Sequence, residues 1–191
     1  MDEEVLSNIH AYWCSLRRDR PMPARGDIDP AEIPKLLPHL MLTDVLENGQ
    51  FRYRLIGTEV ERSFGAPVTG RTLEELMFGE YLTYMTGLYR RVVQEKRPIF
   101  SVSRYGGTDR DHPLFTKRVM MPLSTQGASV DMVLSAQVFV RVGGLDDRTA
   151  LALLNSDGYT GYADESYTAS ETCGSATLDL AGPMTRKATV E

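Results

Sequence analysis

Apolar residues recur along the start of the chain at the spacing of a helix. The pattern predicts an amphipathic helix within residues 1–20, and the helix should end before Pro21 because proline lacks the amide that a helix interior needs. A helix with one apolar face buries that face, so we expect it to contact either the domain's own sheet or a partner such as a second subunit. The residues that form this face are Val5, Ile9, Trp13 and Leu16.

A hairpin signal follows at Asn48-Gly49, which separates an apolar run over residues 39–46 from an alternating run over residues 51–55. Asn-Gly between two such runs is the strongest short-range indication of a β-hairpin. The sequence therefore predicts two neighbouring antiparallel strands. Upstream, Asp29-Pro30 predicts the start of a short helix, with the aspartate as N-cap and the proline in the first helical position.

The helical spacing returns between Leu82 and Val92 and predicts a helix that ends before Pro98. Three strand-like runs follow, over residues 99–105, 116–123 and 131–142. Their connections are too short for parallel crossovers, so the strands should be antiparallel. The fold class is α/β of the α+β type, with a five-stranded antiparallel sheet and helices on one face.

Composition separates the end of the chain from the rest. Of the formal net charge of −5, residues 155–191 contribute −4, from six acidic and two basic residues. We expect four segments: the helix over 1–20, a domain over 21–142, a short helix over 143–154 and an acidic, flexible tail over 155–191. The nearly neutral body disfavours nucleic-acid binding.

Two further observations bear on where the chain acts. The apolar runs are far shorter than the roughly 20 residues of a membrane span, and the N-terminus lacks the pattern of a secretory signal. The sequence therefore predicts a cytoplasmic protein without a membrane partner. Cys14 and Cys173 are too few and too far apart for a disulfide framework or a cysteine-based zinc site.

The order of elements resembles a PAS domain. A more specific resemblance comes from the proline-rich stretch Pro23-Ala-Arg-Gly-Asp-Ile-Asp-Pro30 and from Phe51-Arg-Tyr-Arg-Leu-Ile-Gly-Thr58. These stretches resemble a bacterial PAS-like family that is common in alphaproteobacteria and largely uncharacterised, over roughly residues 10–142. The resemblance implies a cytoplasmic sensory or interaction module without catalytic residues, and some relatives are linked to motility and cell-cycle signalling.

Motifs of catalysis are missing from the sequence, which contains no GxSxG, HExxH, GxxxxGK[ST] or GxGxxG arrangement. The three histidines, His10, His39 and His112, are scattered and do not suggest a metal site. PAS-like folds that hold a photoactive flavin carry an Asn-Cys-Arg-Phe-Leu stretch, which is absent, and residues 80–97 offer no histidine for a haem. We expect no catalytic residue, no metal and no cofactor.

Polar residues within otherwise apolar runs are the candidates for a ligand pocket between the sheet and the helices. Strand alternation sends half of any such set away from the pocket, and the sequence leaves open whether Thr43 or Asp44 faces inward. Ser103 and Gln137 are further candidates. The residues that we select as ligand-binding are His39, Thr43, Tyr53, Ser101, Arg118 and Ser135.

Together these patterns predict a non-enzymatic, cytoplasmic sensory module that binds a protein partner and a small uncoloured ligand in its core, and that can form a homodimer. The alternative is a constitutive adaptor whose core is packed solid by methionines. A small-molecule enzyme is the third hypothesis. Neither the identity of the ligand nor that of the partner follows from the sequence.

Overall fold

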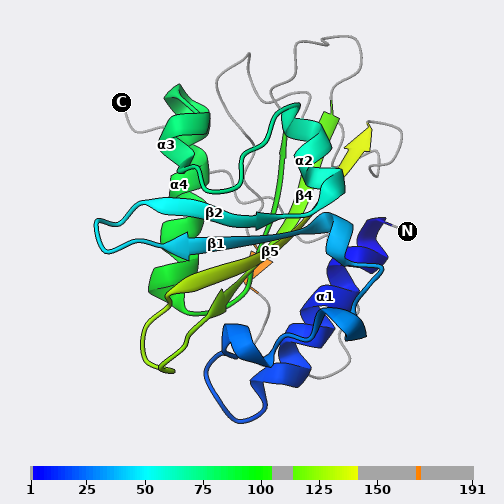
Figure 1. Ribbon diagram of the computed structural model, residues 1–191, viewed down its shortest axis with the longest axis vertical. Coiled ribbons are helices and arrows are strands. Elements are labelled where there is room, and N and C mark those ends of the chain that lie inside the picture. Colours follow the sequence, from blue (N-terminus) through cyan, green and yellow to red (C-terminus); the bar gives the residue numbers. More distant parts are fainter. Residues whose placement is uncertain (1, 105–113, 142–166, 169–191) are drawn as a thin grey trace.

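The computed structural model describes residues 2–104, 114–141 and 167–168. Figure 1 shows helices arranged around a twisted sheet. The elements are α1 (Asp2–Arg17), the single 3₁₀ turns η1 (Arg25–Asp27), η2 (Pro30–Glu32) and η3 (Leu37–His39), β1 (Leu40–Val45), β2 (Phe51–Ile56), α2 (Thr58–Phe64), α3 (Leu73–Leu76), α4 (Gly79–Glu95), β3 (Ile99–Arg104), β4 (Leu114–Leu123), β5 (Met132–Arg141) and β6 (Tyr167–Thr168).

The sheet has the order β2-β1-β5-β4-β3-β6, and all of its pairs are antiparallel. The predicted five-stranded antiparallel sheet is confirmed, and β6 adds two residues at the edge of β3. The central pair, β4 and β5, runs in register from Leu114 opposite Arg141 to Leu123 opposite Met132. The predicted helix over 143–154 and most of the segment 155–191 lie outside the described residues.

The predicted turn at Asn48-Gly49 and the predicted helix cap at Asp29 are both present in the structure. Gly49 has a φ of +80°, and the Asn48 side chain accepts a hydrogen bond of 3.0 Å from the amide of Gln50, which closes the turn between β1 and β2. The Asp29 side chain accepts a bond of 2.9 Å from the amide of Ala31. The predicted short helix is therefore real, although η2 is a single 3₁₀ turn.

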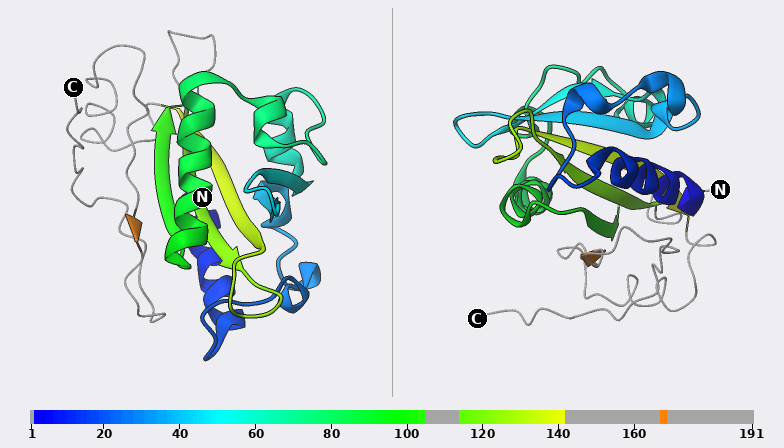
Figure 2. Two further views of the ribbon diagram at one scale, coloured as in Figure 1. Left: turned by 90° about the vertical axis from the view of Figure 1, so that its left-hand side faces the viewer. Right: turned by 90° about the horizontal axis from the view of Figure 1, so that it is seen from below.

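Helix α4 covers one face of the sheet, and α1 covers the other (Figure 2). From α4, the Tyr89 hydroxyl lies 3.0 Å from the Thr43 hydroxyl on β1, and the Tyr89 ring stacks on Phe51 of β2. From α1, the Trp13 Nε1 donates a hydrogen bond of 2.9 Å to the carbonyl of Pro122 on β4. The leading helix, whose contact surface the sequence left open, thus adds a second layer, because β4 and β5 are buried on both faces and need a layer on each side.

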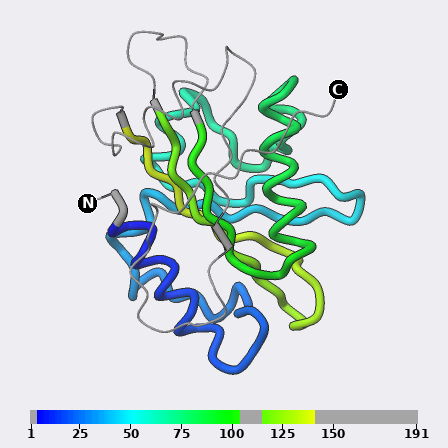
Figure 3. Tube along the Cα trace, turned by 180° about the vertical axis from the view of Figure 1, so that it is seen from behind, coloured from blue at the N-terminus to red at the C-terminus, as the bar shows by residue number. Residues whose placement is uncertain are grey.

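The apolar face of α1 lies against the chain's own sheet, the first of the two alternatives drawn from the sequence. Ile9 and Trp13 are fully buried, while Val5 and Leu16 are partly buried and pack against the same core. After α1 the connector turns back along the helix to β1, as Figure 3 shows from behind. The Tyr12 hydroxyl fixes this return by accepting a hydrogen bond of 2.9 Å from the amide of Asp29.

Within the residues described, no helix combines the length and the apolar character that a bilayer crossing requires.

Candidate functional site

The bond between Thr43 and Tyr89 decides which strand positions face α4. Because Thr43 points to α4, its neighbours Leu42 and Asp44 point to the other side of the sheet. Residues directly opposite one another on paired strands share a face, so the alternation carries across the sheet. Through these pairings the residues that face α4 include five of the six ligand candidates: Thr43, Tyr53, Ser101, Arg118 and Ser135.

The polar positions form a patch centred on Arg118. In one row across three strands, Ser101 of β3 lies opposite Arg118, and Arg118 lies opposite Gln137 of β5. In the next row, Ser103 lies opposite Thr116. Thr116 was not among the candidates from the sequence, because strand alternation alone does not show which positions face the helix. We call Arg118, Ser101, Ser103, Thr116 and Ser135 the Arg118 cluster.

Arg118 is a buried cation without an anion in the described part of the chain. Its side chain is 1% exposed, and none of its three nitrogens has a hydrogen-bond partner among the described residues. The guanidinium does contact the ring of Tyr84 on α4, whose centroid lies 6.0 Å from the guanidinium carbon. The guanidinium of arginine keeps its positive charge in proteins, so a buried arginine is a buried charge.

The contact with the Tyr84 ring is weaker than the cost of burying the charge of Arg118. A cation over an aromatic face gains about 0.5–2 kcal/mol. Removing a charged group from water costs several kcal/mol after relaxation, and that cost is offset only by good geometry with an opposite charge and by hydrogen bonds. The contact with Tyr84 therefore does not balance the burial of Arg118, and an acceptor for the guanidinium is missing from the described residues.

Four hydroxyls around Arg118 are also buried and without a hydrogen-bond partner among the described residues. The oxygens of Ser101, Ser103, Thr116 and Ser135 are buried and have no hydrogen-bond partner within the described ranges. Buried polar side chains in native proteins are nearly always bonded, and each exception calls for an explanation. Here the four unpartnered hydroxyls lie on one face of the sheet, close to the unpaired guanidinium of Arg118. This concentration of unused donors is typical of a surface that binds a polar group.

The two buried tyrosines of this face do not supply a negative charge. Burial raises the pKa of Tyr53 well above its ordinary value, with the nearby Tyr89 as the next contribution. Burial likewise raises the pKa of Tyr89, although the hydrogen bond with Thr43 opposes that rise. Both phenols are therefore neutral at physiological pH, so neither of them balances the positive charge of Arg118.

His39 is the ligand candidate that the structure does not bring to this face. The sequence placed it in the first strand, but it is the last residue of η3, where its amide donates a hydrogen bond of 2.9 Å to the carbonyl of Leu36. Pro38 within the turn favours the 3₁₀ conformation, so the strand begins one residue later. The side chain of His39 is partly exposed.

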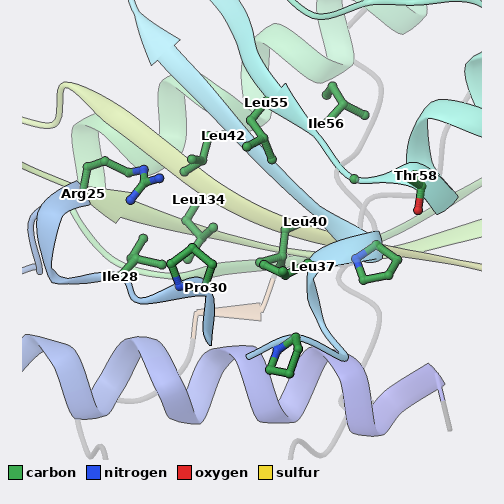
Figure 4. Close-up of a pocket in the computed structure, with 13 residues that line it drawn as sticks. Arg25, Ile28, Pro30, Leu37, Leu40, Leu42, Leu55, Ile56, Thr58 and Leu134 are labelled. Carbon is green, nitrogen blue, oxygen red and sulfur yellow. The ribbon is translucent and has the colours of Figure 1, made fainter. Parts of the chain in front are cut away.

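A second feature, an apolar groove of about 410 Å³, lies on the opposite face between the connector and the strands β1 and β2 (Figure 4). Leu40, Leu42 and Leu134 form its floor, and Arg25 is the only charged side chain among its lining residues. Two lining residues, Leu37 and Leu55, are 36% and 42% exposed. Sequence analysis did not find this groove, because the connector and the hairpin meet only in the folded chain.

A family model described as a PAS domain matches residues 1–137. The chain therefore belongs to the PAS domain family, as its sequence resemblance indicated. Domains of this family are in general sensory and signalling modules. The match therefore includes α1, the strands β1 to β4 and the first part of β5.

Solved structures similar to this chain include the LOV protein of Rhodobacter sphaeroides, with 17% sequence identity, 63% of this chain and 76% of that chain covered, and a TM-score of 0.42. RsLOV D109G and the RsLOV d2 variant each share 19% identity at a TM-score of 0.42. The matches cover 61% and 60% of this chain and 66% and 64% of those chains, so the chain spans just under two thirds of each. A comparison with curated proteins found no significant match.

Proposed function

We propose that this PAS domain is a non-enzymatic sensor that binds a small molecule at the Arg118 cluster and responds by changing its contacts with a protein partner. The observation that carries the proposal is the buried guanidinium of Arg118, which has no hydrogen-bond partner among the described residues. A bound molecule with acceptor oxygens would satisfy it. Residence in the cytoplasm and formation of a homodimer remain predictions from the sequence.

The chemistry of this face supports a ligand over a solid core. Methionines do fill part of the interior, and Met41, Met85 and Met120 are nearly fully buried. A core that served packing alone would carry a further apolar side chain at position 118, because an unpaired buried charge is strongly unfavourable. Retention of an arginine there has a physical reason if the protein uses it to recognise a ligand.

Helix α4 connects the proposed ligand to a response. Its Tyr84 lies over Arg118, and its Tyr89 contacts Thr43, so α4 and the Arg118 cluster share one interface. A ligand that binds between them changes the equilibrium between two positions of α4 only if its affinity for those positions differs. The signal would then be a different surface presented by α4 to a partner.

Three measurements on the full chain test this proposal. Thermal unfolding across a metabolite panel should show a rise in the melting temperature for one chemical class, since a ligand of the native state stabilises it by mass action. Native mass spectrometry of the purified protein should show the mass of a bound small molecule, and the absorbance spectrum should have no band beyond the ultraviolet. If no compound stabilises the protein and none is carried through purification, the sensor proposal is wrong.

The constitutive adaptor is the second candidate function, and the apolar groove favours it. Leu37 and Leu55 are two of the three large hydrophobic residues that the described part of the chain exposes, and both line that groove. The two functions predict different results for a partner once it is identified. A sensor's partner affinity changes with the ligand, whereas an adaptor's partner affinity responds to Leu55→Glu and not to any small molecule.

A further inference from the structure

We infer that the ligand of the Arg118 cluster is a small monocarboxylate that carries at least one further hydroxyl or carbonyl oxygen. This inference rests on the proposed function and adds the chemical class of the ligand. It follows from three properties of the described residues: the charge of the cluster, the number and position of its donors, and the apolar side chains around it.

Charge indicates an anion with a single negative charge. Arg118 contributes one positive charge, and no ion pair among the described residues neutralises it. Lys117, the adjacent cation, points to the opposite face of the sheet because it neighbours Arg118 along β4. A carboxylate balances one guanidinium, whereas a phosphate monoester would bring about −1.5 to −2 charges into a buried site that holds one.

The geometry of the guanidinium fits a carboxylate as well. Its five N–H donors form a planar fork that matches two carboxylate oxygens. All three of its nitrogens are without partners in the described ranges, so the whole fork is available. Ser101 lies directly opposite Arg118 on β3, and it can donate to the same carboxylate or to a neighbouring oxygen.

The number of donors requires more than a carboxylate. The guanidinium and the four unpartnered hydroxyls of the cluster together offer nine donors, five and four, while a carboxylate accepts about four hydrogen bonds. Ser103 and Thr116 form the next pair on the same face, two residues along the strands from Ser101 and Arg118. A hydroxyl or carbonyl oxygen near the carboxylate is placed to meet them, and a hydroxyl on the ligand can also donate to their oxygens.

The remaining neighbours restrict the ligand's size and polarity. On the same face, Met120 follows Arg118 two residues later on β4, and Phe139 lies opposite Thr116. The Tyr84 ring covers the guanidinium from α4. An apolar boundary around a compact polar patch fits a short acid, such as a hydroxy acid or an oxo acid, and not a long or multiply charged molecule.

The test uses acetate as a simple monocarboxylate probe, followed by glycolate, lactate and pyruvate, each compared with chloride at equal ionic strength. Unfolding temperature and titration calorimetry are measured on the full-length chain, on Arg118→Met and on the matched control Lys117→Met. Lys117 is a second buried cation next to Arg118, but on the other face of β4. Arg118→Lys is a third variant, which keeps the charge and loses the planar fork of donors.

We expect acetate to stabilise the wild-type chain and Lys117→Met, the hydroxy and oxo acids to bind more tightly than acetate, and Arg118→Met to weaken each acid by about 10- to 100-fold. The affinity of Arg118→Lys for each acid should lie between those of the wild-type chain and Arg118→Met. If Arg118→Met does not fold, a loss of affinity in Arg118→Lys that Lys117→Met does not share still supports the assignment.

Other results overturn the inference without touching the proposed function. These are a neutral or cationic ligand that stabilises the protein while acetate does not, inorganic phosphate that binds as tightly as the hydroxy acids, or equal affinities in wild type and Arg118→Met. Absence of stabilisation by every small molecule tested, together with no bound mass in the purified protein, would overturn both.

Discussion

Replacing Trp13 tests whether α1 is part of the folded domain or an element held for a second subunit. Trp13 is 1% exposed, its Nε1 donates a hydrogen bond of 2.9 Å to the carbonyl of Pro122, and its ring lies near His10. Trp13→Phe removes that donor and part of the buried ring, which should lower the free energy of unfolding by about 2 kcal/mol. Trp13→Ala leaves a cavity as well and should cost about 3–5 kcal/mol.

Urea unfolding followed by circular dichroism measures these losses, and fluorescence does not serve because Trp13 is the single tryptophan of the chain. For a chain of this length each kcal/mol corresponds to about 2–4 °C in melting temperature. Asn8→Ala, an exposed position on the same helix, is the control and should stay within about 0.5 kcal/mol of wild type. The reasoning is refuted if Trp13→Phe is as stable as Asn8→Ala, or if the wild-type stability depends on protein concentration in a way that Trp13→Phe abolishes.

Two further predictions concern the fold. Gly57→Ala should be strongly destabilising, because a Cβ at this position would overlap the backbone oxygens of Leu37 and Pro38, whereas Gly87→Ala in α4 meets no atom within 4 Å and should stabilise by about 0.5–1 kcal/mol; equal melting temperatures for the two variants would contradict this. Burial lowers the pKa of His10, so the folded state disfavours its protonation, and the free energy of unfolding should fall as the pH drops below about 6.5, the ordinary value of an exposed imidazole. His10→Phe, which keeps a ring against Phe100, should lack this slope, and an unchanged pH profile would show that another group causes it.

Local chemistry made the strands and helices predictable. The Asn48-Gly49 turn, the helical spacing between Leu82 and Val92 and the Asp29 cap act through neighbours in the sequence, and each appears in the structure where the pattern placed it. The family resemblance was also recognisable from the sequence, because the proline-rich connector and the second strand contain distinctive sequence motifs.

Contacts between distant residues account for what sequence reasoning did not settle. Strand parity depends on the bond between Thr43 and Tyr89, which are 46 residues apart, so alternation alone could not choose between Thr43 and Asp44. Thr116 was overlooked because only the folded sheet places it on the buried face beside Arg118. The layer formed by α1 depends on Pro122, which is 109 residues from Trp13.

The central claim is that Arg118 recognises an anion in the core. A crystal structure of the full chain grown with a saturating hydroxy acid tests it most directly. The account predicts two carboxylate oxygens at about 2.7–2.9 Å from the Arg118 nitrogens, with at least one hydroxyl of the cluster bonded to the same molecule. A guanidinium paired only with carboxylates of its own chain, while the acid is absent from the core, would contradict it.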